Sequence, residues 1–225
     1  MKVNGIPTRT IWSIDNGQAI GVIDQTKLPY VFEKVVLKTW QEVRQAIATM
    51  MVRGAPLIGI TGAWGMVLGI KEDPSDEGIH RVRSELISTR PTAVDLQWGV
   101  DQIVKAVTPI GERERFKVAL KKAEEMTQAN VLANRAIGTH GAKLIAELYA
   151  RKRTPINILT HCNAGWLATV DYGTALSAVY IAFEQGIPLH VWVDETRPRN
   201  QGLLTAWELA GFGIPHTCLL YTSDA

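Results

Sequence analysis

Two polar loops, each following a predicted buried strand, are the first candidates for chemistry. The first loop, Thr160–Gly165, carries Cys162 just after a strand expected at 156–159. The second loop, Asp194–Gly202, carries two acidic and two basic side chains after a strand expected at 189–193. Ligands of open parallel sheets bind at the carboxyl ends of the strands. Both loops are therefore expected to face one crevice.

Cys162 is the candidate reactive group of the first loop. The backbone N–H groups of a loop rich in small residues could lower the pKa of its thiol or bind an anion. The alternative is an inert buried thiol, because free cysteine is among the most buried residue types. Its position leaves both interpretations open. The neighbouring His161 is expected to be a hydrogen-bonded structural histidine rather than a base.

Two arginines in the N-terminal half share one setting. Arg53 precedes Gly54, Ala55 and a helix start, and Arg90 precedes Pro91 and another helix start. A helix N-terminus presents free N–H groups and the positive end of the helix dipole, so an adjacent arginine suits a phosphate or a sugar oxygen. Most arginines are simply surface residues. Two in the same arrangement, together with the strand-end loops, indicate a small phosphorylated substrate.

The sequence argues against a dinucleotide cofactor and against a metal. A dinucleotide fold needs the glycines of G-x-G-x-x-G after its first strand, whereas this loop offers only Gly165 and the distant Gly173. His161 and Cys162 are adjacent, and no C-x-x-C or H-x-x-x-H spacing of metal ligands lies nearby. We therefore expect neither a cofactor nor a metal.

The composition is that of an ordinary soluble globular protein. The 225 residues are 46% hydrophobic and 20% charged, with a net charge of +2. The densest basic cluster, Arg151–Arg153, is expected to be a solvated helix end rather than a nucleic-acid surface. The longest apolar stretch, 57–70, is too short to span a bilayer, and no signal peptide is visible. With only two cysteines, the cytoplasm is the expected compartment.

The N-terminal half is expected to combine a small sheet with helices. Short β-type runs over residues 9–40 predict an antiparallel meander. Helical spacing begins near residue 41, and Thr92–Asp95 resembles a capping box that opens a later helix. One apolar helix carries a row of glycines that predicts close packing against another backbone. The row consists of Gly59, Gly62, Gly65 and Gly69.

The C-terminal part has a different periodicity. A helix is expected over 112–137, where Gly138 and Gly141 break it before helix resumes to about residue 150. From residue 151 the pattern alternates strand, helix, strand, helix, strand. Such βαβ order is typical of a parallel sheet. The predicted fold class is therefore α/β, with a domain boundary near residue 150.

Six segments form one ordered set: Arg53–Gly59, Arg90–Val94, Thr160–Gly165, Gly173–Leu176, Asp194–Pro198 and Leu204–Leu209. In this order and spacing they resemble successive signatures of the methylthioribose-1-phosphate isomerase family, which belongs to a superfamily shared with translation initiation factor two-B. The resemblance runs from about residue 2 to residue 217. It implies a domain of small antiparallel β structure plus helices over 1–150, followed by an incomplete Rossmann-like parallel-sheet domain over 151–225.

The resemblance also implies an activity, an aldose–ketose isomerisation in methionine salvage, and so in methionine and amino-acid biosynthesis. The reaction converts 5-methylthioribose 1-phosphate to 5-methylthioribulose 1-phosphate. In this family a cysteine and an aspartate transfer the proton between C2 and C1, without a metal. A homodimer is implied as well. Carried over to this sequence, the catalytic cysteine is Cys162 and the substrate-binding residues are Arg53, Gly54, Ala55, Arg90 and Gln201.

Two features depart from the family pattern. The segment Gln201–Thr205 is one residue shorter than usual. After Thr217 the family continues with a strand, a Gly-Ala-Asp segment that holds the catalytic aspartate, and an Asn-Lys substrate pair. This sequence instead reads Cys218–Ala225, which we interpret as foreign or read-through residues. The 225 residues are therefore expected to lack the catalytic aspartate and to be inactive alone.

Two alternative functions remain open from the sequence. A ribose-1,5-bisphosphate isomerase would keep the cysteine and the aspartate but would need a second phosphate site. The matches at 90–94 and 194–198 favour the methylthio enzyme. A non-catalytic regulatory subunit of the initiation-factor type would share the fold and act by interaction. Loss of Cys162 or of the turn Arg53–Ala55 would favour that subunit, and both are present.

Overall fold

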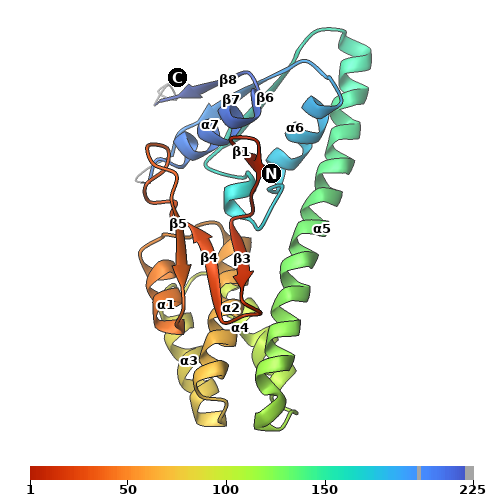
Figure 1. The fold of residues 1–225 in the computed structure, drawn as a ribbon. Helices are drawn as coiled ribbons and strands as arrows, with labels where there is room; N and C mark the ends of the chain where they lie inside the picture. Colours follow the sequence, from red (N-terminus) through yellow and green to blue (C-terminus); the bar gives the residue numbers. More distant parts are fainter. Residues whose placement is uncertain (197–198, 221–225) are drawn as a thin grey trace. The chain divides into compact units, whose positions relative to one another are not determined.

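The computed structural model describes residues 1–196 and 199–220 (Figure 1). Its contacts divide the chain into two compact units, one of residues 10–130 and one of residues 1–9 together with 131–225. The division falls inside the long helix α5, Glu112–Lys152. The domain boundary predicted near residue 150 lies in the same helix and stays a prediction.

The unit of residues 10–130 begins with an antiparallel sheet. Its strands β3 (Ile11–Ile14), β4 (Ala19–Ile23) and β5 (Lys34–Leu37) pair in chain order. Asn16 and Gly17 turn the chain between β3 and β4 with positive φ angles of 53° and 80°, which both residue types tolerate. All five residues of β4 are buried. The predicted meander is confirmed.

Four helices and the first part of α5 complete this unit. They are α1 (Trp40–Ala48), α2 (Ala55–Glu72), α3 (Asp76–Ser88) and α4 (Val94–Val107). A capping box starts α1: Thr39 Oγ1 accepts from the Glu42 N–H, and the Glu42 carboxylate accepts from the Thr39 N–H. Residues 57–70 of α2 are all buried. A helix that is apolar all round belongs in a core, so α2 is the central helix of this unit.

Glycines allow α2 and α4 to touch backbone to backbone. A Cβ atom on Gly59 would lie 2.6 Å from the Asp95 carbonyl oxygen, and one on Gly99 would lie 2.1 Å from the Gly59 carbonyl oxygen. One turn further along, a Cβ atom on Gly62 would lie 2.6 Å from Leu96 Cδ1. The close packing predicted from the glycine row is confirmed. Because Gly59 in the second turn of α2 meets Asp95 in the first turn of α4, the two helices start at the same end.

The predicted capping box at Thr92–Asp95 is wrong. Helix α4 starts at Val94, its N-cap is Ala93, and no side chain makes a capping hydrogen bond there. The N–H of Ala93 donates to the Arg90 carbonyl over 2.9 Å. This turn delays the helix start, so Thr92 lies one position too early to cap it.

The second unit contains the parallel sheet that the βαβ pattern predicts. Strand β6 (Ile156–His161) pairs with β7 (Leu189–Asp194), which pairs with β8 (His216–Leu219). Helix α6 (Ala175–Glu184) connects β6 to β7, and α7 (Gln201–Phe212) connects β7 to β8. The same unit holds the short pair β1 (Lys2–Val3) and β2 (Ile6–Pro7), and the 3₁₀ turn η1 (Trp166–Ala168). The α/β fold class is confirmed.

The two faces of this parallel sheet differ in burial. Side chains alternate along a strand, and Leu189, Val191 and Val193 of β7 are buried. On the other face, Leu159 is 58% exposed and Trp192 is 37% exposed. Leu159 and Trp192 are partners in the register of β6 and β7. They form an apolar pair at the surface.

The break predicted in the long helix is wrong, because α5 is continuous from Glu112 to Lys152. Its glycines serve a packing contact instead of a stop. A Cβ atom on Gly138 would lie 2.1 Å from Ser177 Oγ, and one on Gly141 would lie 2.5 Å from the Cβ of Ala178. Both contacts are with α6, so small residues on α5 allow the two helices to approach closely.

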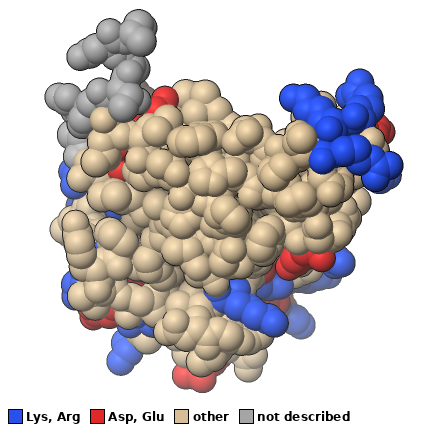
Figure 2. Space-filling view, turned by 90° about the horizontal axis from the view of Figure 1, so that it is seen from above, with Lys and Arg blue, Asp and Glu red and all other residues tan. Residues whose placement is uncertain are grey.

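Charged side chains are unevenly distributed on the face shown in Figure 2. Lys and Arg gather at one corner of that face, and smaller patches of both signs are scattered along its edges. The basic cluster Arg151–Arg153 is exposed at the end of α5, as predicted. Within residues 1–196 and 199–220, none of the helices combines the length and apolarity that a bilayer span requires.

The helix crossing gives a stability prediction. Gly99→Ala should lower the free energy of unfolding by about 1–3 kcal/mol, because the new methyl group meets backbone that cannot yield. The matched control is Gly211→Ala, also inside a helix but with open space around its Cβ position. That control should be stabilising by about 0.4–1 kcal/mol. Equal urea midpoints for the two variants would contradict the proposed packing.

Candidate active site

Cys162 directly follows strand β6 and has an unusual backbone conformation. Its φ angle is 60°, in the left-handed region, which costs a residue with a side chain about 1–2 kcal/mol. Hydrogen bonds hold it there: its N–H donates to the Asp194 carbonyl over 3.3 Å, and its carbonyl accepts from Thr205 Oγ1 at 2.7 Å. The position and direction of the thiol are therefore fixed by contacts from β7 and α7.

The thiol of Cys162 points at Gln201, another residue in the predicted site. Cys162 Sγ donates to Gln201 Oε1 over 2.6 Å, and the side chain of Cys162 is half-buried. Gln201 is the first residue of α7, after Asn200 with a φ angle of 49°. The structure thus brings together two predicted residues from the two strand-end loops. Those loops lie side by side, as the sequence predicts.

One face of α7 contacts the loop of residues 162–167, the Cys162 loop, along two turns. Gln201, Thr205 and Glu208 are spaced i, i+4 and i+7, so they lie on the same side of the helix. Thr205 Oγ1 donates to the carbonyl of Cys162 and accepts from Asn163 Nδ2 at 3.1 Å. Thr205 and Glu208 were not among the site residues predicted from the sequence. The available signal was their spacing within an otherwise apolar helix.

Glu208 is a buried carboxylate surrounded by hydrogen-bond donors. Its Oε1 accepts from Asn163 Nδ2 at 2.8 Å and from the Leu167 N–H at 3.1 Å. Its Oε2 accepts from the Trp166 N–H at 2.8 Å and from the Tyr180 hydroxyl at 2.5 Å. Burial raises the pKa of Glu208 to about 7, and these hydrogen bonds limit the rise. The group is therefore poised to titrate near neutrality.

Two glycines make room for this carboxylate and its loop. A Cβ atom on Gly165 would lie 1.8 Å from Glu208 Oε2. Gly173 has a φ angle of 79°, and a Cβ atom there would lie 2.4 Å from the backbone carbon of Gly165. Only glycine fits either position, so the tight turns of the loop depend on the absence of side chains.

The second loop uses a carboxylate to cap α7. Glu195 Oε1 accepts from the N–H groups of Thr196 and Gly202, and Oε2 accepts from the N–H of Leu203. The first turn of α7 therefore binds an anion of the chain itself. His161 Nδ1 lies 2.9 Å from Asp194 Oδ2, which confirms the expectation of a partnered histidine. Arg197 and Pro198, part of the quoted signature, lie outside the described residues.

The predicted binding residues of the other unit lie around the starts of α2 and α4. Arg53 is 8% exposed, and its Nη2 donates to the Gln25 carbonyl over 2.6 Å. Gly54 has a φ angle of 89° and is the N-cap of α2, with Ala55 as the first helical residue. Arg90 is half-buried, and its Nη1 is buried without a hydrogen-bond partner among the residues described. The crossing of α2 and α4 places the two helix starts at one end of this unit.

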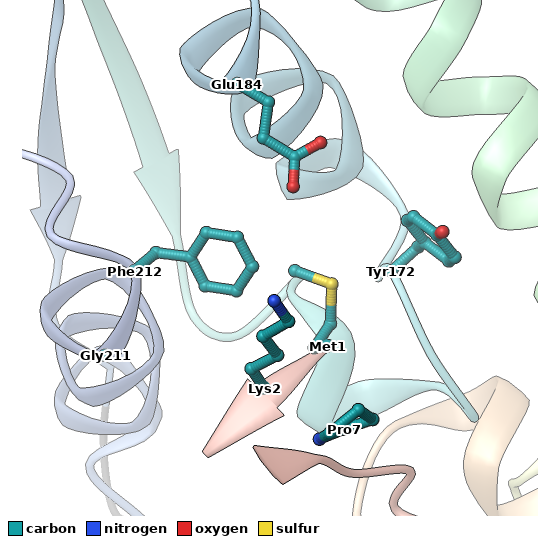
Figure 3. Close-up of a pocket in the computed structure, with 7 residues that line it drawn as sticks. All are labelled: Met1, Lys2, Pro7, Tyr172, Glu184, Gly211 and Phe212. Atoms are coloured by element: carbon teal, nitrogen blue, oxygen red, sulfur yellow. The ribbon is translucent and has the colours of Figure 1, made fainter. Parts of the chain in front are cut away.

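A separate pocket of about 460 Å³ lies in the unit that contains the parallel sheet (Figure 3). Its lining comes from the N-terminal strands, from α6 and α7, and from the turn before α6. The lining residues are Met1, Lys2, Pro7, Tyr172, Glu184, Gly211 and Phe212. None belongs to the predicted site. In the described part of the chain, no three His, Cys, Asp or Glu side chains gather as metal ligands would.

Comparisons with known proteins agree on one family. The pattern of the Initiation factor 2 subunit family matches residues 51–223. A methylthioribose-1-phosphate isomerase of Methylorubrum populi is 50% identical over 97% of this chain and 60% of its own length. One of Paramagnetospirillum magneticum is 52% identical over 97% of this chain and 61% of its own length.

Two solved structures share the fold at substantial sequence identity. The 5-methylthioribose 1-phosphate isomerase of Pyrococcus horikoshii has a TM-score of 0.83 and 32% identity, over 95% of this chain and 60% of that chain. The translation initiation factor eIF-2B subunit delta of A. fulgidus has a TM-score of 0.80 and 38% identity, over 95% and 62%. The chain spans about 60% of the length of its curated relatives. Since the family pattern matches most of its residues, the chain belongs to the Initiation factor 2 subunit family.

Proposed function

We propose that this chain carries the cysteine loop and the phosphosugar-binding residues of a methylthioribose-1-phosphate isomerase. The observation that carries the proposal is the thiol of Cys162, held at a strand end in a left-handed conformation and aimed at Gln201. Backbone strain of this kind persists where surrounding contacts over-determine it, commonly at functional sites. The names of relatives at 50% and 52% identity support the same activity.

The proposed role of Cys162 is proton transfer. The isomerisation breaks the bond between C1 and the ring oxygen, moves the proton of C2 to C1 and converts the C2 hydroxyl to a carbonyl, while the hydroxyl proton goes to the released ring oxygen. Because C1 carries the phosphate, the sugar cannot open as a free aldose does. A half-buried thiol with a fixed direction suits such a transfer. Gln201 accepts a hydrogen bond from the thiol, so it is placed to bind substrate beside the reacting atoms.

The proposed phosphate-binding group lies at the start of α2, with Arg53 and Arg90. The α2 N-terminus has no capping side chain, whereas Glu195 already fills the same position on α7. An uncapped helix start offers N–H groups and a positive dipole end to an anion. Arg90 adds a guanidinium whose buried Nη1 has no partner among the described residues. These features suit an ester phosphate better than a neutral sugar.

The isomerase function needs a second proton-transfer group. The resemblance implies an aspartate in a Gly-Ala-Asp segment, and the sequence contains no such segment. We therefore propose that the 225 residues alone do not turn over substrate. A homodimer is proposed on the same resemblance, and the cytoplasm is proposed as its compartment because the sequence has only two cysteines.

A chimeric protein tests the function directly. Residues 1–217 would be joined to the part of the Methylorubrum populi isomerase that follows its matched region. Conversion of 5-methylthioribose 1-phosphate to the ketose would be measured for the chimera and for the 225-residue chain. We expect turnover in the chimera and none in the chain alone. A chimera that melts cooperatively but does not convert the substrate would refute the proposed function.

In that chimera, Cys162→Ala should lower kcat by about 10²–10⁴-fold, the usual contribution of a general acid or base. Substrate affinity should change much less. The neighbouring variant His161→Ala is the control, because its imidazole is exposed and pairs with Asp194; it should stay within a few-fold of the parent. Turnover of Cys162→Ala within a few-fold of the parent would make the thiol structural.

Arg53→Lys and Arg90→Lys should each raise KM in the chimera while the protein stays folded. Lysine keeps the charge but loses the planar fork that binds two oxygens at once. Arg81→Lys is the control, because Arg81 is an exposed arginine that pairs with Asp73. Its KM should equal that of the parent. Unchanged KM in both test variants would remove these arginines from the phosphate site.

A further inference from the structure

The contact between α7 and the Cys162 loop has an uneven distribution of hydrogen bonds. Gln201 accepts a hydrogen bond from the thiol of Cys162, and Thr205 makes hydrogen bonds with the Cys162 carbonyl and with Asn163. Glu208 accepts three hydrogen bonds from the loop, one from the Asn163 side chain and two from backbone N–H groups of residues 166 and 167. Three of these six hydrogen bonds between the helix face and the loop therefore end on one carboxylate.

The loop depends on this carboxylate because its donors are buried with it. Glu208 is 2% exposed, and Trp166 and Leu167 are at most 1% exposed. A buried N–H group without an acceptor is costly, so these donors need Glu208 or a substitute. Gly165 packs against Oε2 so closely that no side chain fits between them. The loop is shaped around Glu208 rather than merely close to it.

We propose that Glu208 is a positioning residue for Cys162: its ionised carboxylate anchors the loop 162–167 to α7 and so sets the alignment of the thiol with Gln201. This inference rests on the proposed function only in that Cys162 is the reacting group. Glu208 itself has no direct hydrogen bond to Cys162. It acts through Asn163, the next residue along the chain, and through the backbone of residues 166 and 167.

Protonation of Glu208 should loosen this anchor. An ionised carboxylate only accepts hydrogen bonds, whereas a protonated one carries an O–H that faces other donors. Burial raises the pKa of Glu208 to about 7, so the change falls near neutrality. Tyr180 of α6 faces the same oxygen, and burial raises the pKa of its hydroxyl well above the ordinary value, so it stays a donor. Lys2 of β1 lines a cavity of about 140 Å³ together with Glu208.

The test measures thiol chemistry in the whole 225-residue chain and needs no substrate. Cys162 would be alkylated with iodoacetamide across the neutral pH range, and peptide mass spectrometry would separate it from Cys218. Three variants would be compared with the parent. Glu208→Gln removes the titration, Tyr180→Phe removes a hydrogen bond that lowers the Glu208 pKa, and Glu184→Gln is the control at an exposed position on α6.

The alkylation rate of Cys162 in the parent should show a step near pH 7, in addition to the increase that ionisation of the thiol itself produces. The step should be about 3- to 10-fold, which is the factor that loss of one hydrogen bond gives. It should disappear in Glu208→Gln, move to higher pH in Tyr180→Phe and remain in Glu184→Gln. If the Glu208 carboxylate had only a structural role, its replacement would change the overall alkylation rate of Cys162. It would not give the parent a step whose pH shifts in Tyr180→Phe.

Two results would overturn the proposal. One is a parent profile that follows the thiol ionisation alone, and the other is a step that persists unchanged in Glu208→Gln. If circular dichroism shows that Glu208→Gln is unfolded, Tyr180→Phe decides, and an unshifted step counts against the proposal. The outcome is separable from the proposed function. A step together with an inactive chimera supports positioning and refutes the isomerase, whereas an active chimera without a step does the reverse.

Discussion

The Glu208 carboxylate is 2% exposed, so the chain itself must supply the hydrogen bonds that water would give. It receives them from the Cys162 loop and from Tyr180 on α6. One side chain of α7 therefore connects the helix, the loop after β6 and the neighbouring helix. The left-handed backbone of Cys162 is unfavourable by itself, and it is maintained because hydrogen bonds fix this loop on both sides. The direction of the thiol is thus a consequence of a buried charge seven residues after Gln201.

The first turns of α7 and α2, which belong to different units, differ in how their N–H groups are capped. On α7, Glu195 accepts hydrogen bonds from the N–H groups of the first turn, so that end is already neutralised by an anion of the protein. On α2 there is no capping side chain, and the glycine crossing at Gly59 and Gly99 brings the α4 start to the same end. Two positive dipole ends and Arg90 then act in one region.

Local sequence patterns predicted the features that depend on local rules. Alternation and turn residues gave the antiparallel meander, βαβ order gave the parallel sheet, and the glycine row gave the backbone contact at Gly59. The error at Gly138 arose where a distant partner decides, whereas the capping box at Thr92–Asp95 failed because of a local turn. Gly138 does not break α5 because Ser177 packs against it, and nothing near Gly138 in the sequence encodes that contact. Cys162 was a candidate from its place at a strand end and Gln201 from the resemblance, whereas Glu208 needed the three-dimensional contact between α7 and the loop.

Stability of the fold and anchoring of the loop favour opposite protonation states of Glu208. The pKa of Glu208 rises from the ordinary value of 4.5 to about 7, so between these values the folded chain binds more protons than the unfolded one. Stability from this group is therefore present below pH 4.5 and is lost as pH rises to about 7. The loss is about 3 kcal/mol, a substantial share of the roughly 5–15 kcal/mol that keeps a domain folded. Yet the ionised form is the one whose oxygens accept all four donors. The chain thus gives up stability at neutral pH to hold the thiol of Cys162 in place.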